Sequence, residues 1–407
     1  MYFRHSRCFR SPSASAKLAV GIVLGLTLAT GPLLFGQTVW NGNTTVWNTA
    51  GNWSAGLPSA TVAASFGNPT GGNYNLTFTG AGTALGITFT NAGTSGYNLN
   101  TSGQTLTVDG NGIVNNNAFT QTFSGTGAVS TGATQTWNAA TGGLAFTQST
   151  LNINNTLTLT GANGISVSST TATTLGANLT YTGSGTGANA DSFSGTVTQS
   201  GSRMITNNGT GSLTFNAINL TNSGTNRTLT VAGSGNTIVG GAIANGGAGT
   251  GSLTYSGTGS LTLSGTNTYT GTTTLSGTGK LNINSATALG TGTFTISGAG
   301  TIDNTSGGAI RLTNNNAQNW NSNFTFAGTN DLNLGTGNVT INASRTVTVT
   351  AGNLTVGGVV NDGANTFGMT KNGAGTLIFS GANTYTGATT INTGTLSVGT
   401  LALGGTA

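Results

Sequence analysis

The 407-residue sequence has no glutamate, one cysteine and one histidine, and charged residues make up only 4% of it. Soluble domains usually carry about 25% charged residues, so threonine, asparagine, serine and the backbone must make most of the contact with solvent. Acid–base catalysis usually depends on histidine or on a pair of carboxylates with displaced pKa values. The histidine is His5, near the N-terminus, and the carboxylates are five widely spaced aspartates: Asp109, Asp191, Asp303, Asp331 and Asp362. We therefore expect no enzymatic activity, and the sequence indicates no catalytic residue, no cofactor and no metal site.

One group of charged residues is less scattered. Asp303 and Asp331 would come within one or two turns of each other in a coiled fold, and Lys280 and Arg311 lie nearby in the sequence. Such a group resembles the site of a β-helical polysaccharide lyase or hydrolase. Aspartate before asparagine or glycine, as at Asp303 and Asp362, is also ordinary turn chemistry. We favour the turn interpretation over catalysis.

Proline is scarce and glycine is abundant. None of the four prolines lies beyond Pro69, so no proline interrupts a β-ladder there. The 70 glycines have no every-third-residue period, which excludes collagen. Disorder is an alternative for this composition, but apolar and polar residues alternate repeatedly, as in residues 157–159 (LTL) and 346–349 (TVTV). This period of two is typical of strands with one buried face.

Residues 1–36 have the pattern of an export signal. Arg4, Arg7, Arg10 and Lys17 precede an apolar run over residues 18–29, which is short for a membrane-spanning helix. The other six basic residues are scattered singly along a chain with five acidic ones. We therefore expect no nucleic-acid partner.

Residues 37–70 differ in composition from the rest. They hold Trp40, Trp47 and Trp53, three of the five tryptophans, together with Pro58 and Pro69. An aromatic cluster can bind sugars by stacking, but the end of a coiled β-fold also exposes apolar surface and unpaired strand edges. We expect this segment to be a Trp-rich N-terminal cap, with a sugar site as the alternative.

Residues 71–407 consist of short alternating runs between Gly, Asn and Thr turns. A unit recurs in them: residues 257–283 (GTGSLTLSGTNTYTGTTTLSGTGKLNI) return as residues 373–398 (GAGTLIFSGANTYTGATTINTGTLSV), with 12 identities over the first 19 positions. We expect Gly265, Gly271 and Gly277 to supply the positive φ of sharp turns. Recurrence and the variable links between runs favour a solenoid over a sandwich or barrel. At roughly 22 residues per turn, this part would make about 15 turns.

The run G-x-G-x-L-x-x-S-G-x-N-T-Y-T-G-x-T-T, present in both copies, resembles the autotransporter-associated β-strand repeat, also called the passenger-associated transport repeat. The resemblance implies an all-β fold: a right-handed parallel β-helix after an N-terminal signal peptide. The right hand is also the usual chirality of parallel connections. A Q-x-W-N pattern at residues 135–138 and 318–321 is similar to the family as well. We expect its tryptophans, Trp137 and Trp320, to pack at corners rather than to serve as ligand platforms.

The resemblance implies where in or outside the cell the protein is located, but it implies no enzymatic reaction. We expect a structural or adhesin-like passenger or stalk that is exported to the bacterial cell surface, the outer membrane or the medium. The implied partner is an outer-membrane translocation barrel, either downstream in the same polypeptide or in a separate protein, and the target of adhesion would be a surface glycan or a host or neighbouring cell. Because the sequence ends directly after the second copy, a truncated reading frame is one expectation. The alternative function is a secreted β-helix that binds or cleaves carbohydrate.

Overall fold

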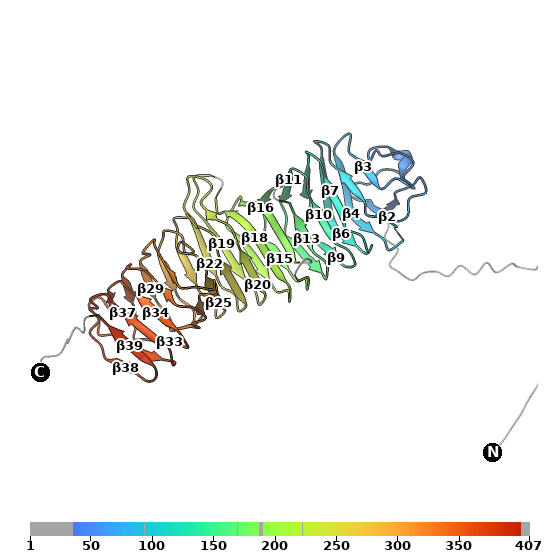
Figure 1. Ribbon diagram of the computed structural model, residues 1–407. Coiled ribbons are helices and arrows are strands. Elements are labelled where there is room, and N and C mark those ends of the chain that lie inside the picture. The colour runs from blue at the N-terminus through green and yellow to red at the C-terminus, as the bar shows by residue number, and fades with distance from the viewer. Residues whose placement is uncertain (1–35, 93, 169, 187–189, 222, 400–407) are drawn as a thin grey trace, which may run out of the picture. The chain divides into compact units, whose positions relative to one another are not determined.

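The computed structural model describes residues 36–399, apart from residues 93, 169, 187–189 and 222. The predicted export signal, residues 1–36, therefore lies outside the described residues except for Gly36. In the described part the chain forms strand after strand, and its one short helix is the 3-10 helix η1 (Ala50–Asn52). The named strands pair in parallel, most of them with both the strand one turn earlier and the strand one turn later (Figure 1). This is a β-solenoid of about 15 turns.

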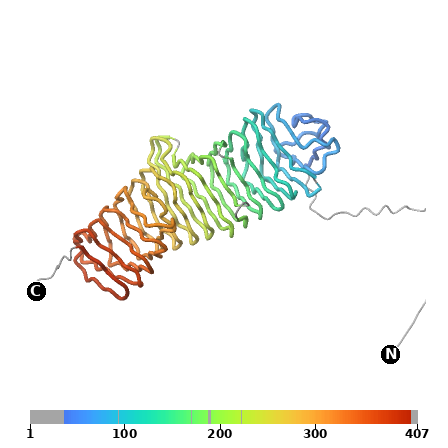
Figure 2. Tube along the Cα trace, in the orientation of Figure 1, coloured from blue at the N-terminus to red at the C-terminus, as the bar shows by residue number. Residues whose placement is uncertain are grey.

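The strand pairing divides the solenoid into three faces. Figure 2 shows the turns stacked one after another along the axis. Face 1 consists of β8 (Ala128–Thr131), β11 (Thr150–Ile153), β14 (Ala172–Leu175), β21 (Ile243–Ala244), β28 (Ile310–Arg311), β31 (Leu332–Asn333), β34 (Asn353–Val356), β37 (Thr376–Phe379) and β39 (Thr395–Val398). Between β21 and β28 the ladder of face 1 continues without named strands, through backbone hydrogen bonds from Thr268 to Ile243, Thr291 to Tyr269 and Thr313 to Ala286.

The other two faces hold most of the remaining strands. Face 2 consists of β1 (Gln37–Val39), β2 (Ala63–Phe66), β9 (Gln135–Ala139), β12 (Leu157–Gly161), β15 (Leu179–Tyr181), β17 (Arg203–Asn207), β19 (Arg227–Ala232), β22 (Gly251–Tyr255), β24 (Thr273–Leu275), β26 (Phe294–Ile296), β29 (Gln318–Trp320), β32 (Val339–Ile341) and β35 (Val360–Asn361). Face 3 consists of β3 (Asn75–Thr77), β5 (Asn98–Asn100), β7 (Gln121–Ser124), β10 (Leu144–Phe146), β13 (Ile165–Val167), β20 (Asn236–Val239), β23 (Ser260–Leu263), β25 (Lys280–Ile283), β27 (Thr301–Asp303), β30 (Phe324–Phe326), β33 (Arg345–Val349), β36 (Met369–Asn372) and β38 (Thr389–Ile391). Four longer strands bend from one face to the next: β4 (Gly82–Phe89), β6 (Thr105–Asn115), β16 (Asp191–Gln199) and β18 (Ser212–Asn219).

The parallel β-helix predicted from the sequence is confirmed, and its right hand stays a prediction. The turns vary in length: Thr376 pairs with Thr395, 19 residues on, whereas Gln37 pairs with Ala63, 26 residues on. One consequence is that the two sequence repeats do not lie on the same faces. Residue Leu261 of the first copy lies in β23 on face 3, whereas its equivalent, Leu377, lies in β37 on face 1.

Alternating side chains build one continuous core along the axis. In β12, Leu157 and Leu159 are fully buried and Thr158 between them is half-buried. The same inward side chains stack from turn to turn, as with Phe123 and Phe146, whose ring centroids lie 4.8 Å apart. Removal of this apolar surface from water is the main driving force for the fold.

The three tryptophans of residues 37–70 pack against one another and belong to the hydrophobic core of the solenoid. Trp53 lies 5.1 Å from Trp40 and 4.9 Å from Trp47, both measured between ring centroids and both edge to face. Trp47 stacks on Phe78 at 4.6 Å, which joins the cluster to the core of the next turn. Within this segment β1 and β2 already pair in parallel, so the ladder begins before residue 71.

The glycines of the repeat have a different role from the one expected. Gly265, Gly271 and Gly277 do not have the positive φ that was predicted for them, and that prediction is wrong. Instead, a Cβ atom on Gly265 would lie 1.8 Å from the carbonyl oxygen of Gly241, one turn earlier. On Gly277 it would lie 2.2 Å from the carbonyl oxygen of Gly257. These positions need glycine because the backbones of neighbouring turns approach too closely for any side chain.

Candidate functional site

The charged group predicted around Asp303 is a structural junction between turns. Lys280 and Asp303 form an ion pair, with 3.2 Å between Nζ and Oδ2, and the Asp303 side chain is fully buried. The backbone N–H of the adjacent Asn304 donates to Oδ1 at 2.9 Å. From the next turn, the backbone N–H of Thr329 also donates to Oδ1 at 3.0 Å, and its hydroxyl donates to Oδ2 at 2.8 Å. Burial raises the pKa of Asp303, but these hydrogen bonds and the Lys280 charge outweigh it and leave the pKa lowered.

Asp331 makes a second junction of the same kind, and it is not paired with Asp303. Its Oδ1 accepts the backbone N–H of Asn353 at 2.9 Å, and its Oδ2 accepts the side-chain amide of Asn353 at 2.8 Å. Each carboxylate therefore holds the turn that follows it, with its oxygens already occupied by protein donors. Within the described residues, no group of three or more His, Cys, Asp or Glu could hold a metal ion.

The tryptophans expected as either cap or sugar platforms are inside the protein. Trp40 and Trp47 are 1% exposed and Trp53 is 4% exposed, so no indole face of this cluster is open to a sugar ring. Two of the three indole N–H groups also make internal hydrogen bonds: Trp40 donates to the carbonyl oxygen of Asn73 at 3.0 Å, and Trp53 donates to that of Trp47 at 2.9 Å. That residues 37–70 act as an N-terminal cap stays a prediction.

The Q-x-W-N pattern provides an internal partner for a buried indole. Trp137 is 1% exposed, and its Nε1 donates to Gln135 Oε1 at 2.8 Å. Trp320 is fully buried, and its Nε1 donates to Gln318 Oε1 at 3.2 Å. Buried tryptophans need a partner for the indole N–H, and the glutamine two residues earlier supplies it without leaving the strand.

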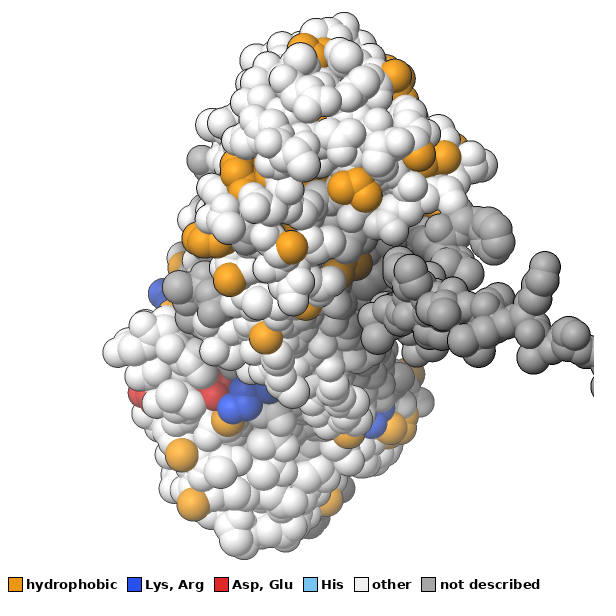
Figure 3. All heavy atoms as spheres, turned by 90° about the vertical axis from the view of Figure 1, so that its right-hand side faces the viewer, with side chains coloured by type: hydrophobic (Ala, Val, Ile, Leu, Met, Phe, Trp, Pro, Cys, Tyr) orange, Lys and Arg blue, Asp and Glu red, His pale blue; other side chains and the backbone are white. Residues whose placement is uncertain are grey.

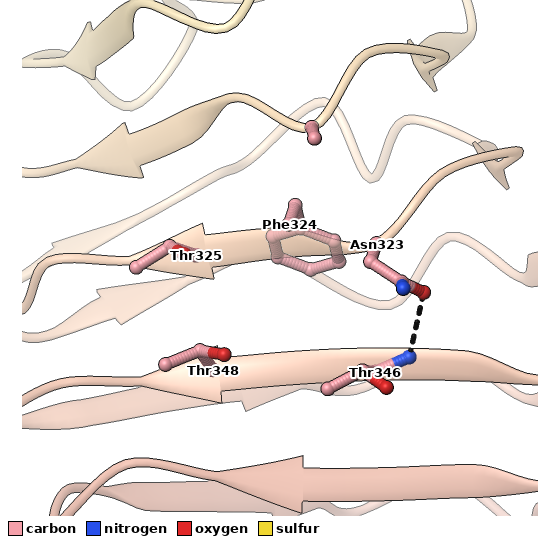
Figure 4. A pocket seen from close by; sticks show the side chains of 6 residues that line it. Asn323, Phe324, Thr325, Thr346 and Thr348 are labelled. Atoms are coloured by element: carbon pink, nitrogen blue, oxygen red, sulfur yellow. Dashed lines mark hydrogen bonds between the residues drawn. The ribbon is translucent and has the colours of Figure 1, made fainter.

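One shallow pocket, of about 270 Å³, opens between turns of face 3 (Figure 4). Thr325 and Thr348 lie side by side on β30 and β33, and the backbone N–H of Thr346 donates to Asn323 Oδ1 at 2.9 Å. The ring of Phe324 is only 4% exposed and offers little stacking surface. The pocket is lined by hydroxyl, amide and apolar groups without a charge: Ala299, Asn323, Phe324, Thr325, Thr346 and Thr348.

Asp191 is the most unusual carboxyl in the described part. It is 2% exposed, its Oδ1 accepts the backbone N–H of Ile165 at 2.7 Å, and its Oδ2 has no hydrogen-bond partner. Burial raises the pKa of Asp191 from 3.8 to about 7, against the opposing effect of the Ile165 hydrogen bond. At comparable positions other turns use amides: Gln121 accepts from Tyr97, one turn earlier, at 2.7 Å.

The repeat builds a cluster that sequence reasoning missed, and we call it the clasp. In the first copy the clasp consists of Asn267, Tyr269 and Thr273. Asn267 Oδ1 accepts the backbone N–H of Ile243 from the turn before at 2.7 Å, and its Nδ2 donates to the carbonyl oxygen of Ala288 in the turn after at 2.6 Å. One side chain thus connects three turns, with both of its polar atoms buried.

The other two members of the clasp act together. The hydroxyl groups of Tyr269 and Thr273 are 2.5 Å apart, and Thr273 donates to the carbonyl oxygen of Leu289 at 2.8 Å. Tyr269 is fully buried, and burial raises the pKa of its hydroxyl far above its ordinary value. The sequence contains a signal for this cluster, because N-T-Y-T-G-x-T-T is the longest shared part of the two copies. The partners are backbone groups of other turns, so the role could not be assigned from the motif alone.

The second copy repeats the clasp on another face. Asn383 Oδ1 accepts the backbone N–H of Val360 at 2.9 Å, and the hydroxyl groups of Tyr385 and Thr389 are 2.7 Å apart. Val360 begins β35 on face 2, whereas Ile243, its counterpart in the first copy, begins β21 on face 1. The clasp therefore travels with the sequence unit and not with a face of the solenoid.

The surface offers little charge to a partner. Figure 3 shows one side of the molecule as mostly uncharged polar atoms, with isolated apolar side chains and few charged ones. In the described part Lys280–Asp303 is the only ion pair. The large exposed apolar side chains lie far apart in the sequence: Val39, Leu57, Phe119, Met204 and Ile391. No helix among residues 36–399, as far as they are described, has the length and apolar character needed to cross a membrane.

Comparison with protein families finds a match to the passenger-associated-transport-repeat family at residues 253–285 and 369–398. The resemblance predicted from the sequence is therefore confirmed for these two regions. Both regions contain the three residue types of the clasp, within residues 267–273 of the first and 383–389 of the second. No curated protein and no solved structure matches the chain.

Proposed function

The chain carries two passenger-associated transport repeats on a parallel β-solenoid, and from this premise we propose that it is an exported structural passenger or stalk of a bacterial surface protein. The observation that carries the proposal is the coincidence of the repeat with the clasp, since the family signature is what fastens turn to turn. About 15 turns at about 4.8 Å per turn give an extension of about 70 Å. A solenoid whose turns contact only their neighbours suits a spacer.

Several features support export of an unfolded chain. Residues 37–407 contain no cysteine, so no disulfide can close a loop that would obstruct passage through a pore. Each turn buries its apolar side chains only when it stacks on the previous one, so folding outside the membrane would oppose the return of the chain. We propose an outer-membrane translocation barrel as the partner, either downstream in the same polypeptide or as a separate protein, and the cell surface or the medium as the destination.

The proposal includes no enzymatic activity and assigns adhesion to the outer surface of the solenoid. The carboxylates that resembled a lyase or hydrolase site are occupied by donors from neighbouring turns, which supports a role in folding. The alternative function, carbohydrate binding, cannot use the tryptophans as stacking surfaces because they are buried. A carbohydrate site would therefore have to lie in the uncharged pocket beside Phe324. A glycan array probed with the purified chain would decide between the two: binding that is lost in Thr348→Leu would favour the carbohydrate alternative.

The export proposal is tested by fractionation of a bacterium with two membranes that expresses the full chain. We expect the wild-type chain to be shortened at its N-terminus and to leave the cytoplasm. The matched control is the double variant Leu24→Arg/Leu26→Arg, which interrupts the apolar run of residues 18–29 and should keep the chain unprocessed in the cytoplasm. A wild-type chain that stays full-length in the cytoplasm, just as the variant does, would contradict the proposal.

A further inference from the structure

Phe119 is an exposed aromatic side chain on a loop that hydrogen bonds hold firmly. The loop joins β6 to β7, where the chain passes from face 2 to face 3. Phe119 is 47% exposed, whereas the other phenylalanines of the described part are buried or half-buried. Its backbone N–H donates to Asn117 Oδ1 at 2.9 Å, and its carbonyl oxygen accepts from Asn115 Nδ2 at 3.0 Å. A third buried amide, Gln121 Nε2, donates to the same oxygen at 2.7 Å. Such a preorganised aromatic side chain loses little entropy when a partner covers it.

The uncharged pocket beside Phe324 lies along the same edge of the solenoid. Asn323 and Phe324 stand where the chain passes from β29 on face 2 to β30 on face 3, as Phe119 does between β6 and β7 (Figure 4). The lining offers methyl groups from Ala299 and from three threonines, and no charge. Its volume is about 270 Å³, and apolar cavities of about 150 Å³ already accept benzene. The pocket therefore has room for one phenyl ring.

Between the two sites, face 3 forms a polar strip with one outward apolar side chain near its middle. Nine steps of the ladder separate β7 from β30, or about 43 Å at about 4.8 Å per step. Ile238 lies in register with Thr214 and Thr262, which face outward, and it is half-buried and outside the core. Its strand, β20, is five steps from β7 and four from β30.

Two copies of the chain, placed face to face and antiparallel, would fill both pockets at once. A two-fold axis that lies in the plane of contact and runs across the solenoid keeps the same edge of face 3 on the same side and reverses the direction along the axis. Phe119 of each copy then meets the pocket of the other, and the two Ile238 side chains meet one step apart at the centre. We propose that the chain forms an antiparallel homodimer through face 3, with Phe119 seated in the pocket beside Phe324 of the second copy.

The charge and the size of face 3 suit such a pair. Among the outward residues of the strip from β7 to β30, Lys280 is the one charged side chain, and it is already paired with Asp303. The two Lys280 side chains would lie five steps, or about 24 Å, apart in the dimer, well beyond the screening length of about 10 Å at 0.1 M salt. A strip about 43 Å long and about 15 Å wide covers roughly 650 Å² per copy, within the range of about 600–1,000 Å² per partner in stable interfaces. Because the two contacts are identical, the assembly closes as a pair and does not continue into a filament.

This proposal is independent of export, and sedimentation equilibrium of the purified full chain tests it. The readout is the dissociation constant of the dimer. Each Phe119 anchor should be worth about thirtyfold in affinity, so Phe119→Ser, which removes both anchors, should weaken the dimer about a thousandfold. The matched control is Met204→Ser, which removes a side chain of similar exposure, 40%, from β17 on face 2 and should leave the dissociation constant unchanged. Circular dichroism should show that both variants keep their β-structure.

Engineered disulfides test the orientation, because Cys8 is the only cysteine of the sequence. In a Cys8→Ser background, a mixture of Thr120→Cys and Thr346→Cys chains should cross-link under mild oxidation, since these positions flank Phe119 and line the pocket. Thr120→Cys alone should not cross-link, because its two copies would lie about 43 Å apart. Cross-linking of Thr120→Cys with itself, or equal dissociation constants for Phe119→Ser and Met204→Ser, would overturn the proposal. A wild type that stays monomeric at every concentration would overturn it as well and leave the pocket to another ligand, such as a sugar.

Discussion

The buried carboxyl of Asp191 makes the stability of the solenoid depend on pH. Asp191 accepts one backbone hydrogen bond from Ile165, while its second oxygen is buried without a partner. An ionised carboxylate in that position is poorly compensated, which is why burial raises its pKa to about 7. Asn267, which accepts the equivalent hydrogen bond from Ile243, also donates from its amide and carries no charge. We therefore expect Asp191→Asn to stabilise the protein above neutral pH.

The magnitude follows from the shift in pKa between the folded and unfolded states. In the unfolded chain Asp191 ionises near 3.8, and in the folded protein near 7, so the folded state holds an extra proton between these values. Because its folded pKa is raised, the carboxyl is most favourable to folding at low pH, and stability falls as pH rises from about 4 to 7. The free energy of unfolding of Asp191→Asn relative to wild type should thus increase by about 4 kcal/mol between pH 4 and pH 8.

Urea denaturation at pH 4, 6 and 8 measures this difference, with exchange of the Ile165 amide as a local readout because long repeat proteins can unfold in parts. Any cost of the unpaired amide in the variant is the same at every pH, so the change with pH is the decisive quantity. Asn267→Asp is the reciprocal control, and its stability relative to wild type should fall over the same pH range. If the pH profiles of Asp191→Asn and wild type run parallel, the carboxyl is not titrating in the folded protein and the reasoning is refuted.

Three further predictions concern the junctions between turns. Gly265→Ala should lower the free energy of unfolding by about 1–3 kcal/mol, because its Cβ would meet the Gly241 carbonyl oxygen. Gly224→Ala, which has open space around the site, should change it little in the same urea titration. Equal effects of the two substitutions would contradict the conclusion that Gly265 is needed for the close approach of neighbouring turns. Gln135→Leu should lower the free energy of unfolding, measured by heat or urea, by about 1–3 kcal/mol, because it leaves the Trp137 indole N–H buried without a partner. Adding Trp137→Phe to this variant should recover part of the lost stability. No loss of stability in Gln135→Leu would mean that the indole finds another acceptor. Asp303→Asn should lower the melting temperature at pH 7 and by a smaller amount at acidic pH, since the lowered pKa of Asp303 gives stability that is lost as pH falls through it. An equal loss at both pH values would show that packing and not charge is responsible.

The architecture could be predicted because it depends on local alternation, which the sequence shows directly. Runs such as residues 157–159 have one apolar face, and their burial in β12 follows from that pattern. The recurrence of the unit around Leu261 and Leu377 favoured a solenoid, and the parallel pairing of strands in successive turns confirmed it. The burial of Trp137 and Trp320 was also expected, although the partner glutamines two residues earlier were not recognised.

The roles that could not be predicted depend on contacts between turns. Gly265 is indistinguishable in sequence from a glycine that adopts a positive φ, because the carbonyl that excludes a side chain belongs to Gly241. Asn267 was seen only as part of a motif, since its two partners, Ile243 and Ala288, lie 24 residues before it and 21 residues after it. Asp191 likewise looked like one isolated acid among five, and its burial becomes visible only once β16 is placed beside β13.

The mismatch between sequence repeat and turn length limits what the repeats can do together. The equivalent residues Leu261 and Leu377 lie on faces 3 and 1, so the two copies point in different directions around the axis. A straight or flat partner, such as a polymer chain lying along one face, can therefore touch the same residues of only one copy at a time. Binding through both copies at once, and the avidity that it would bring, requires a partner that wraps around the solenoid. This geometry suits repeats that stabilise the contacts between turns of the solenoid better than repeats that form a row of identical binding sites.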